Sequence, residues 1–294
     1  MITSIYRKAI PESFRQIIYN AFLGRIVYFV RHFKIIIKTK LYYLFHFLLP
    51  KSERNDALAF LGKHGLTSYI GDHVQKYKHL KVSVEKDNNR ELFYVLHRGK
   101  KLFFPKHYDQ SKVVKDYKAL VIEQDEDSAH RYVKNYDDLK DFILLDVGAA
   151  EGIFALDTID FTKKVYLVEC LGHWQAPLMA TFEPWKDKVE IVRKYAGEKT
   201  NDQFIALDDL VLNTSDKIFI KMDIEGAERY AIEGLNKTIN VNPNIQFSVC
   251  TYHRPDDPTL LQDKFRVNGF KTEFTKGFMY WNKRISKGII RAWK

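Results

Sequence analysis

Charged side chains follow several short apolar runs in the second half of the chain. The runs are FILLDVG, KVYLVEC, KVEIVRKYAG, KIFIKMDIEG and IQFSVCTYH, and the side chains at their ends are Asp146, Glu169, Asp223, Glu225 and His253. Near-continuous apolar runs that alternate with helix-length segments predict a parallel sheet covered on both faces. Ligands of such sheets bind outside the carboxyl ends of the strands, so these side chains are expected to line a ligand site.

The first run leads into the turn Asp146-Val147-Gly148-Ala149-Ala150-Glu151-Gly152. Small residues let the backbone approach a ligand closely, and amides at the start of the next helix favour a carboxylate. The turn departs from GxGxxG and lacks the Gly-Lys-Ser/Thr of triphosphate loops. Glu169 follows about twenty residues later, where an acid can hydrogen-bond both ribose hydroxyls. Together they indicate an adenosine-containing cofactor and leave NAD and S-adenosylmethionine open.

A second charged string, Lys-Met-Asp-Ile-Glu-Gly-Ala-Glu, occupies residues 221–228. If residues 221–225 are extended, Lys221, Asp223 and Glu225 share one face and meet near the cleft. The alternative is structural: Asp223 or Glu225 caps the helix that follows, while Lys221 pairs with an acid.

Taken together, DVGAAEG, the acid in VYLVEC, LDDL at residues 207–210, IKMDIEGAE and CTYHRPDD resemble the FkbM family of S-adenosylmethionine-dependent methyltransferases. The likeness covers about residues 142–274. It implies an α/β fold with a class I methyltransferase, Rossmann-like doubly wound sheet. It also implies methyl transfer from S-adenosylmethionine, commonly to oxygen on sugars or natural products.

The resemblance assigns the cofactor-binding residues by position. Those of the turn are Asp146, Gly148, Ala150, where the family usually has Asn, and Gly152. Glu169 would hold the ribose. Asp208 is a further candidate for the cofactor site, although LDDL also fits an ordinary N-cap before a helical turn.

The expected reaction requires a group that takes a proton from the acceptor, because the sulfonium methyl is already activated. His253 is the expected base, since an imidazole accepts a proton near neutral pH. Asp223 would orient that imidazole or, with Glu225, hold a divalent cation through oxygen ligands. The alternative is a loop histidine bonded to backbone. Cys170 and Cys250 are expected to be free thiols without a catalytic role.

The segments before this domain have weaker signals. Runs at residues 80–85, 91–96 and 101–105, separated by turn-forming clusters, predict a small β-meander. Residues 108–141 are expected to be mostly helical, and the acidic segment EQDEDSAHRY at residues 123–132 is expected to form a solvated face.

Charge is concentrated at the amino terminus. Residues 1–50 hold eight Lys or Arg and one Glu, so +7 of the net charge of +10 lies there. Basic residues interrupt the apolar runs before they reach the roughly 20 residues of a spanning helix. Helices lying on an anionic membrane surface fit this pattern, and packing on the main domain is the alternative. A cleaved signal peptide is not expected.

The sequence therefore predicts three parts: a basic amphipathic helical extension at residues 1–50, a linker with the meander and helices at 51–141, and a methyltransferase domain at 142–294. The expected function is O-methylation of a sugar hydroxyl on a bacterial surface glycan or glycolipid intermediate, at the cytoplasmic membrane face. The alternatives are an NAD-dependent oxidoreductase and a non-enzymatic membrane-binding module. No nucleic acid is expected as a partner, because the Asn/Asp-Pro-Pro-aromatic motif of base methyltransferases is missing.

Overall fold

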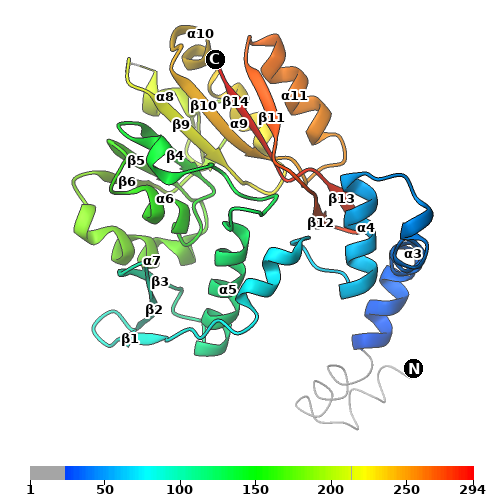
Figure 1. Ribbon diagram of the computed structural model, residues 1–294. Coiled ribbons are helices and arrows are strands. Elements are labelled where there is room, and N and C mark those ends of the chain that lie inside the picture. Colours follow the sequence, from blue (N-terminus) through cyan, green and yellow to red (C-terminus); the bar gives the residue numbers. More distant parts are fainter. Residues whose placement is uncertain (1–23, 213) are drawn as a thin grey trace, which may run out of the picture. The chain divides into compact units, whose positions relative to one another are not determined.

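The computed structural model describes residues 24–212 and 214–294 (Figure 1). Its contacts divide the chain into one unit that ends at Thr67 and another that comprises Ser68–Lys294. The expected extension at residues 1–50 falls in part on residues 1–23, which lie outside the described residues.

The smaller unit contains the helices α3 (Gly24–Leu44) and α4 (Glu53–His64), with the short 3-10 helix η2 (His46–Leu48) between them. Ser52 caps α4 by accepting a hydrogen bond from Asn55 N at 3.2 Å. The two α-helices pack closely, because a Cβ at Gly62 would lie 2.1 Å from Thr39 O. None of the helices in the part of the chain that the structure describes is long and apolar enough to cross a bilayer.

Among the described residues of the larger unit, seven strands form one sheet in the order β11-β14-β10-β9-β4-β5-β6 (Figure 1). Their bounds are β4 (Ile143–Val147), β5 (Lys164–Val168), β6 (Val189–Val192), β9 (Ile218–Met222), β10 (Ile245–Cys250), β11 (Lys271–Phe274) and β14 (Ile289–Trp293). The first five are parallel, and β14 is antiparallel to both of its neighbours. They coincide with the five apolar runs, so the predicted doubly wound sheet is confirmed.

Helices cover both faces of this sheet. They are α6 (Ile153–Thr158), α7 (Gly172–Phe182), α8 (Asp208–Val211), α9 (Glu228–Glu233), α10 (Asn236–Val241) and α11 (Asp257–Val267). Successive residues of a strand pack in the hydrophobic clusters on opposite faces of the sheet. Leu144 packs in the cluster that includes residues of α6 and α7, and Leu145 packs in the cluster that includes residues of α9 and α11. Burial on both faces explains why the strands are apolar throughout.

The predicted meander is confirmed, with a first strand that begins later than expected. It consists of β1 (Glu85–Asp87), β2 (Leu92–His97) and β3 (Lys100–Phe103). Arg98 and Gly99 join β2 to β3 with φ of 51° and 81°, as a two-residue hairpin turn requires. Because β3 packs against α6 and α7, the meander belongs to the larger unit rather than to a separate linker. Short pairs β7 (Tyr195–Ala196) with β8 (Phe204–Ile205) and β12 (Met279–Trp281) with β13 (Arg284–Ser286) complete the strands.

The expectation for residues 108–141 is only partly correct. Helix α5 (Gln110–Glu123) and the 3-10 helix η4 (Tyr136–Leu139) flank an irregular stretch at residues 124–135. The prediction of a solvated face there is wrong, because His130 is only 1% exposed. The main chain of this stretch is held on the sheet: Tyr132 O accepts hydrogen bonds from Ser248 Oγ at 2.6 Å and Arg291 Nε at 3.0 Å.

Candidate functional site

The candidate site lies where the strand order of the sheet reverses. From β4 the chain proceeds outward through β5 and β6, and then returns to β9 on the other side of β4. A crevice at such a switch point is the usual ligand site of an open α/β sheet. Gly148 and Asp223 follow these two strands, and a Cβ at Gly148 would lie 2.0 Å from Asp223 O. Only glycine therefore fits at position 148, where φ is 75°.

The turn after β4 is tight throughout. Ala150 has a left-handed φ of 46°, which costs a residue with a Cβ about 1–2 kcal/mol. Its amide donates a 2.9 Å hydrogen bond to Glu169 Oε2, which holds the turn in place. Gly152 precedes α6, and a Cβ there would lie 2.7 Å from the Phe182 ring. The predicted turn residues thus lie together at the crevice.

A cavity of about 250 Å³ opens on one side of this turn. Its walls include Gly148, Glu169, Cys170, Leu171, Tyr195, Asp223, Ile224 and Glu225. Glu169 is 5% exposed, and its Oε1 accepts the Leu171 amide at 2.7 Å. Each carboxylate oxygen has a further lone pair, so the fixed group can accept two hydroxyl hydrogen bonds. The cavity contains the acid that the sequence predicts for ribose binding.

A smaller cavity of about 140 Å³ lies on the other side of Gly148. Its walls include Glu123, Tyr132, Asp146, Glu151, Lys221 and Asp223. Lys221 Nζ lies 2.9 Å from Asp146 Oδ1 and donates a 2.6 Å hydrogen bond to Gly148 O. Burial would lower the pKa of Lys221, but the charges of Asp146 and Asp223 raise it overall. Lys221 therefore pairs with an acid, as the structural alternative holds, and that pair braces the turn.

Asp223 faces both cavities and lies between two imidazoles. Its Oδ1 is 3.3 Å from His253 Nε2, and its Oδ2 accepts the Tyr132 hydroxyl at 3.1 Å and lies 3.5 Å from His130 Nε2. Burial would raise the pKa of Asp223, but the hydrogen bond and charge of His130, with Lys221 and His253, lower it overall. The carboxylate is therefore held as an anion.

Glu225 is turned away from this cluster. Its φ is 57°, and its side chain is 77% exposed, with Oε2 3.7 Å from His253 Nε2. The alternation expected for residues 221–225 ends at Met222, where β9 stops. Glu225 therefore lies at the rim of the site. Among the described residues, neither Asp223 nor Glu225 caps α9, which Ala227 precedes without a side-chain cap.

The prediction that Asp223 orients the His253 imidazole is only partly correct. Asp223 lies near Nε2, but Glu228 contacts Nδ1. Glu228 is 0% exposed, and its Oε1 lies 2.8 Å from His253 Nδ1 while accepting the amides of Ile224 and Gly226 at 3.0 and 3.3 Å. His253 Nε2 is buried and has no hydrogen-bond partner among the described residues. Burial lowers the pKa of His253, but Glu228 and Asp223 raise it overall, which strengthens the imidazole as a proton acceptor. An acid in the first turn of a helix commonly reaches back to preceding amides, a signal that marks Glu228.

Asp208 is placed outside the crevice. Its Oδ1 accepts hydrogen bonds from Thr238 N at 2.8 Å and Thr238 Oγ1 at 2.6 Å, and its Oδ2 accepts Lys237 N at 3.1 Å. It is not among the described wall residues of either cavity. The cofactor role expected for Asp208 therefore has no support here. Its carboxylate binds the first turn of α10, whereas the sequence suggested a cap on the adjacent helix.

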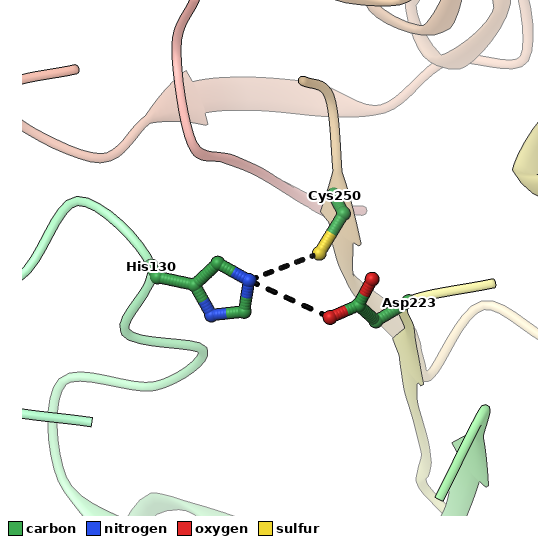
Figure 2. A group of neighbouring side chains, drawn as sticks. All are labelled: His130, Asp223 and Cys250. Atoms are coloured by element: carbon green, nitrogen blue, oxygen red, sulfur yellow. Dashed lines mark hydrogen bonds and ion pairs between the residues drawn. The ribbon is translucent and has the colours of Figure 1, made fainter. Parts of the chain in front are cut away.

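Two residues of the site come from a segment that the sequence analysis treated as solvated. Glu123 is the last residue of α5, and His130 lies in the irregular stretch that follows it. The His130 imidazole lies against Asp223 and Cys250 (Figure 2). The one sequence feature that could have indicated this site was a single histidine in an acidic run. The burial of this segment depends on contacts with β10 and β14, which the sequence does not show.

Comparisons with known proteins point to one family. Residues 69–272 match the family model described as the methyltransferase FkbM domain. No curated protein matches this sequence. A methyltransferase FkbM structure from Methylobacillus flagellatus KT has 18% identity and a TM-score of 0.43, with 63% of this chain and 56% of that chain covered. A SAM-dependent methyltransferase from Aquifex aeolicus has 13% identity and a TM-score of 0.36, with 63% and 97% covered. The chain thus spans 56% of the length of the first structure.

Proposed function

The chain belongs to the methyltransferase FkbM domain family, and on that premise we propose that it transfers a methyl group from S-adenosylmethionine to an acceptor oxygen. The observation that carries this proposal is the glycine turn and Glu169 at the reversal of the sheet. The cavity beside Glu169 suits the adenosine, and the cavity beyond Gly148 suits the methionine end. Both meet at Asp223, where the methyl group would then lie. An NAD-dependent oxidoreductase is disfavoured, because the turn lacks GxGxxG.

Glu169→Gln is expected to weaken S-adenosylmethionine binding by about 10- to 100-fold, because a hydrogen bond to a charged group contributes roughly 1.5–3 kcal/mol. Isothermal titration calorimetry measures this directly, with competition by S-adenosylhomocysteine but not by NADH. Glu190→Gln is the matched control, since that acid pairs with Lys164 at the exposed edge strand β6. Equal affinity in the wild type and Glu169→Gln would contradict the assignment.

The acceptor that we propose is a sugar hydroxyl of a glycan or glycolipid intermediate. His253 Nε2 would take the hydroxyl proton while the oxygen attacks the sulfonium methyl. The carbon–sulfur electron pair returns to sulfur, which leaves S-adenosylhomocysteine, a methyl ether and a protonated imidazole. The buried, unpartnered Nε2 beside Asp223 supports this role. Glu228 would hold the imidazole by its other nitrogen throughout.

A membrane-bound acceptor is consistent with the composition of α3 and the residues after it. Large apolar side chains there are exposed, among them Val30, Phe47 and Leu48, and so are Lys34 and Lys38. Basic residues near an anionic surface contribute about 1 kcal/mol each. We therefore extend the proposal to peripheral contact with the inner face of the cell membrane.

The expected result is that the full chain floats with anionic vesicles, while Lys34→Glu/Lys38→Glu binds at least tenfold more weakly. The matched control reverses two exposed lysines of the larger unit, Lys115→Glu/Lys199→Glu, and keeps the same net charge. Flotation on vesicles of phosphatidylglycerol and phosphatidylcholine, and on phosphatidylcholine alone, gives the measurement. Equal recovery of both variants would count against membrane contact through α3.

A further inference from the structure

Three side chains from distant parts of the chain converge on one point (Figure 2). They are His130, from the irregular stretch after α5, Asp223, after β9, and Cys250, the last residue of β10. His130 Nε2 lies 3.5 Å from Cys250 Sγ and 3.5 Å from Asp223 Oδ2. His130 is 1% exposed and Cys250 0%, so two of the three groups are fully buried.

We propose that His130, Asp223 and Cys250 bind a zinc-class divalent transition metal. Thiolate, imidazole and carboxylate are the ligands that Zn²⁺ takes in proteins, at bond lengths of about 2.0–2.3 Å. Tetrahedral angles at those bond lengths separate ligand atoms by roughly 3.3–3.7 Å. Both measured separations from Nε2 fall in that range. Cys250 is a free thiol, as the sequence predicts, and the proposal adds a ligand role to it.

The surroundings of His130 match those of a metal-binding imidazole. Its Nδ1 lies 3.3 Å from Glu123 Oε1, and the Tyr69 hydroxyl donates a 2.8 Å hydrogen bond to Glu123 Oε2. A carboxylate at one ring nitrogen fixes the tautomer and directs the lone pair of the other nitrogen to the metal. Nδ1 has no hydrogen-bond partner among the described residues, so the nearby charge of Glu123 would favour the ring proton on Nδ1 and leave Nε2 as the ligand atom.

A second group, Asp223 with Glu228 and His253, is less suited to a metal. Glu228 Oε1 already accepts two backbone amides and contacts His253 Nδ1, so it is committed to hydrogen bonds. The group of His130, Asp223 and Cys250 differs, because the Cys250 thiol accepts no hydrogen bond from a backbone amide of the described residues.

Three protein ligands leave a fourth tetrahedral position. The Tyr252 hydroxyl lies 2.8 Å from His130 Nε2 and 3.4 Å from Asp223 Oδ2, so on metal binding it would shift to hydrogen-bond the fourth ligand. Asp223 lines both cavities, which brings that position near the crevice.

The site is tested by titrating the full-length chain with Co²⁺ and Zn²⁺, without cofactor or acceptor. The wild type is expected to bind one Co²⁺ with a thiolate-to-cobalt charge-transfer band, and Zn²⁺ to displace it. Cys250→Ser, nearly isosteric, should abolish the band and weaken binding by about 100-fold or more, because a hydroxyl is a much poorer ligand for these metals than a thiolate. Glu123→Gln leaves all three ligands in place and should weaken binding by about 10- to 100-fold. Cys170→Ser is the matched control and should retain the band.

Absence of Co²⁺ binding in the wild type, binding without a thiolate band, or equal affinity in Cys250→Ser would each overturn the proposal. Circular dichroism confirms that every variant is folded. Because this titration uses neither S-adenosylmethionine nor an acceptor, failure of the metal site leaves the proposed methyl transfer standing. Conversely, a wild type that fails to bind S-adenosylmethionine in calorimetry would contradict the proposed function without contradicting the metal site.

Discussion

His253→Asn is expected to reduce turnover by about 10²- to 10⁴-fold, the usual contribution of a positioned base, while S-adenosylmethionine still binds. The physical reason is the position of Nε2, which is buried, unpartnered in the described residues and 3.3 Å from Asp223 Oδ1. Glu228 fixes the ring through Nδ1, so the asparagine amide cannot reproduce a basic nitrogen at the same place. Single-turnover rates with a saturating acceptor separate this loss of chemistry from slower product release.

The matched control for this prediction is His173→Asn, because His173 is an exposed histidine of α7. It should retain both turnover and cofactor affinity. Calorimetry with S-adenosylmethionine is needed for each variant. Near-normal turnover of His253→Asn would refute the base assignment and transfer that role to Asp223.

Glu151→Gln is expected to change how the free energy of unfolding depends on pH. Burial, together with the charge of Glu123, raises the pKa of Glu151 to about 8. Between the unfolded pKa of about 4.3 and this value, the unfolded chain releases the proton and the folded chain keeps it. The free energy of unfolding of the wild type should therefore fall by about 1.4 kcal/mol per pH unit over that window, because stability falls where the folded state binds more protons.

Glu151→Gln removes this slope, so its stability relative to the wild type should rise by several kcal/mol between pH 5 and pH 8. Urea unfolding of both proteins at half-unit pH steps measures the difference. Glu126→Gln serves as the control, since the Glu126 side chain is 80% exposed, and it should track the wild type. Parallel stability curves for Glu151→Gln and the wild type would show that Glu151 ionises normally in the folded chain.

The sequence determined the elements of this protein and the turn at its centre. Five apolar runs became the parallel strands of the sheet because burial on both faces requires near-continuous apolar residues, a property visible along the chain. The small-residue turn after the first run was readable from local sequence as well, and in the structure its Gly148 and Gly152 have positive φ. Strand ends then placed Glu169 and Asp223 at one edge of the sheet, where both line the same cavity.

The tertiary structure alone decided which side chains meet at that edge. His130 and Cys250 are 120 residues apart, and they touch because β10 and the segment after α5 are neighbours in space. The polar composition of that segment indicated solvent, but Ser248 and Arg291 donate hydrogen bonds to its carbonyl groups and bury it. The capping role of Asp208 on α10 likewise depends on packing across a gap of 30 residues. Sequence periodicity fixes the face on which a residue lies but not the order of the strands, and strand order determines these partners.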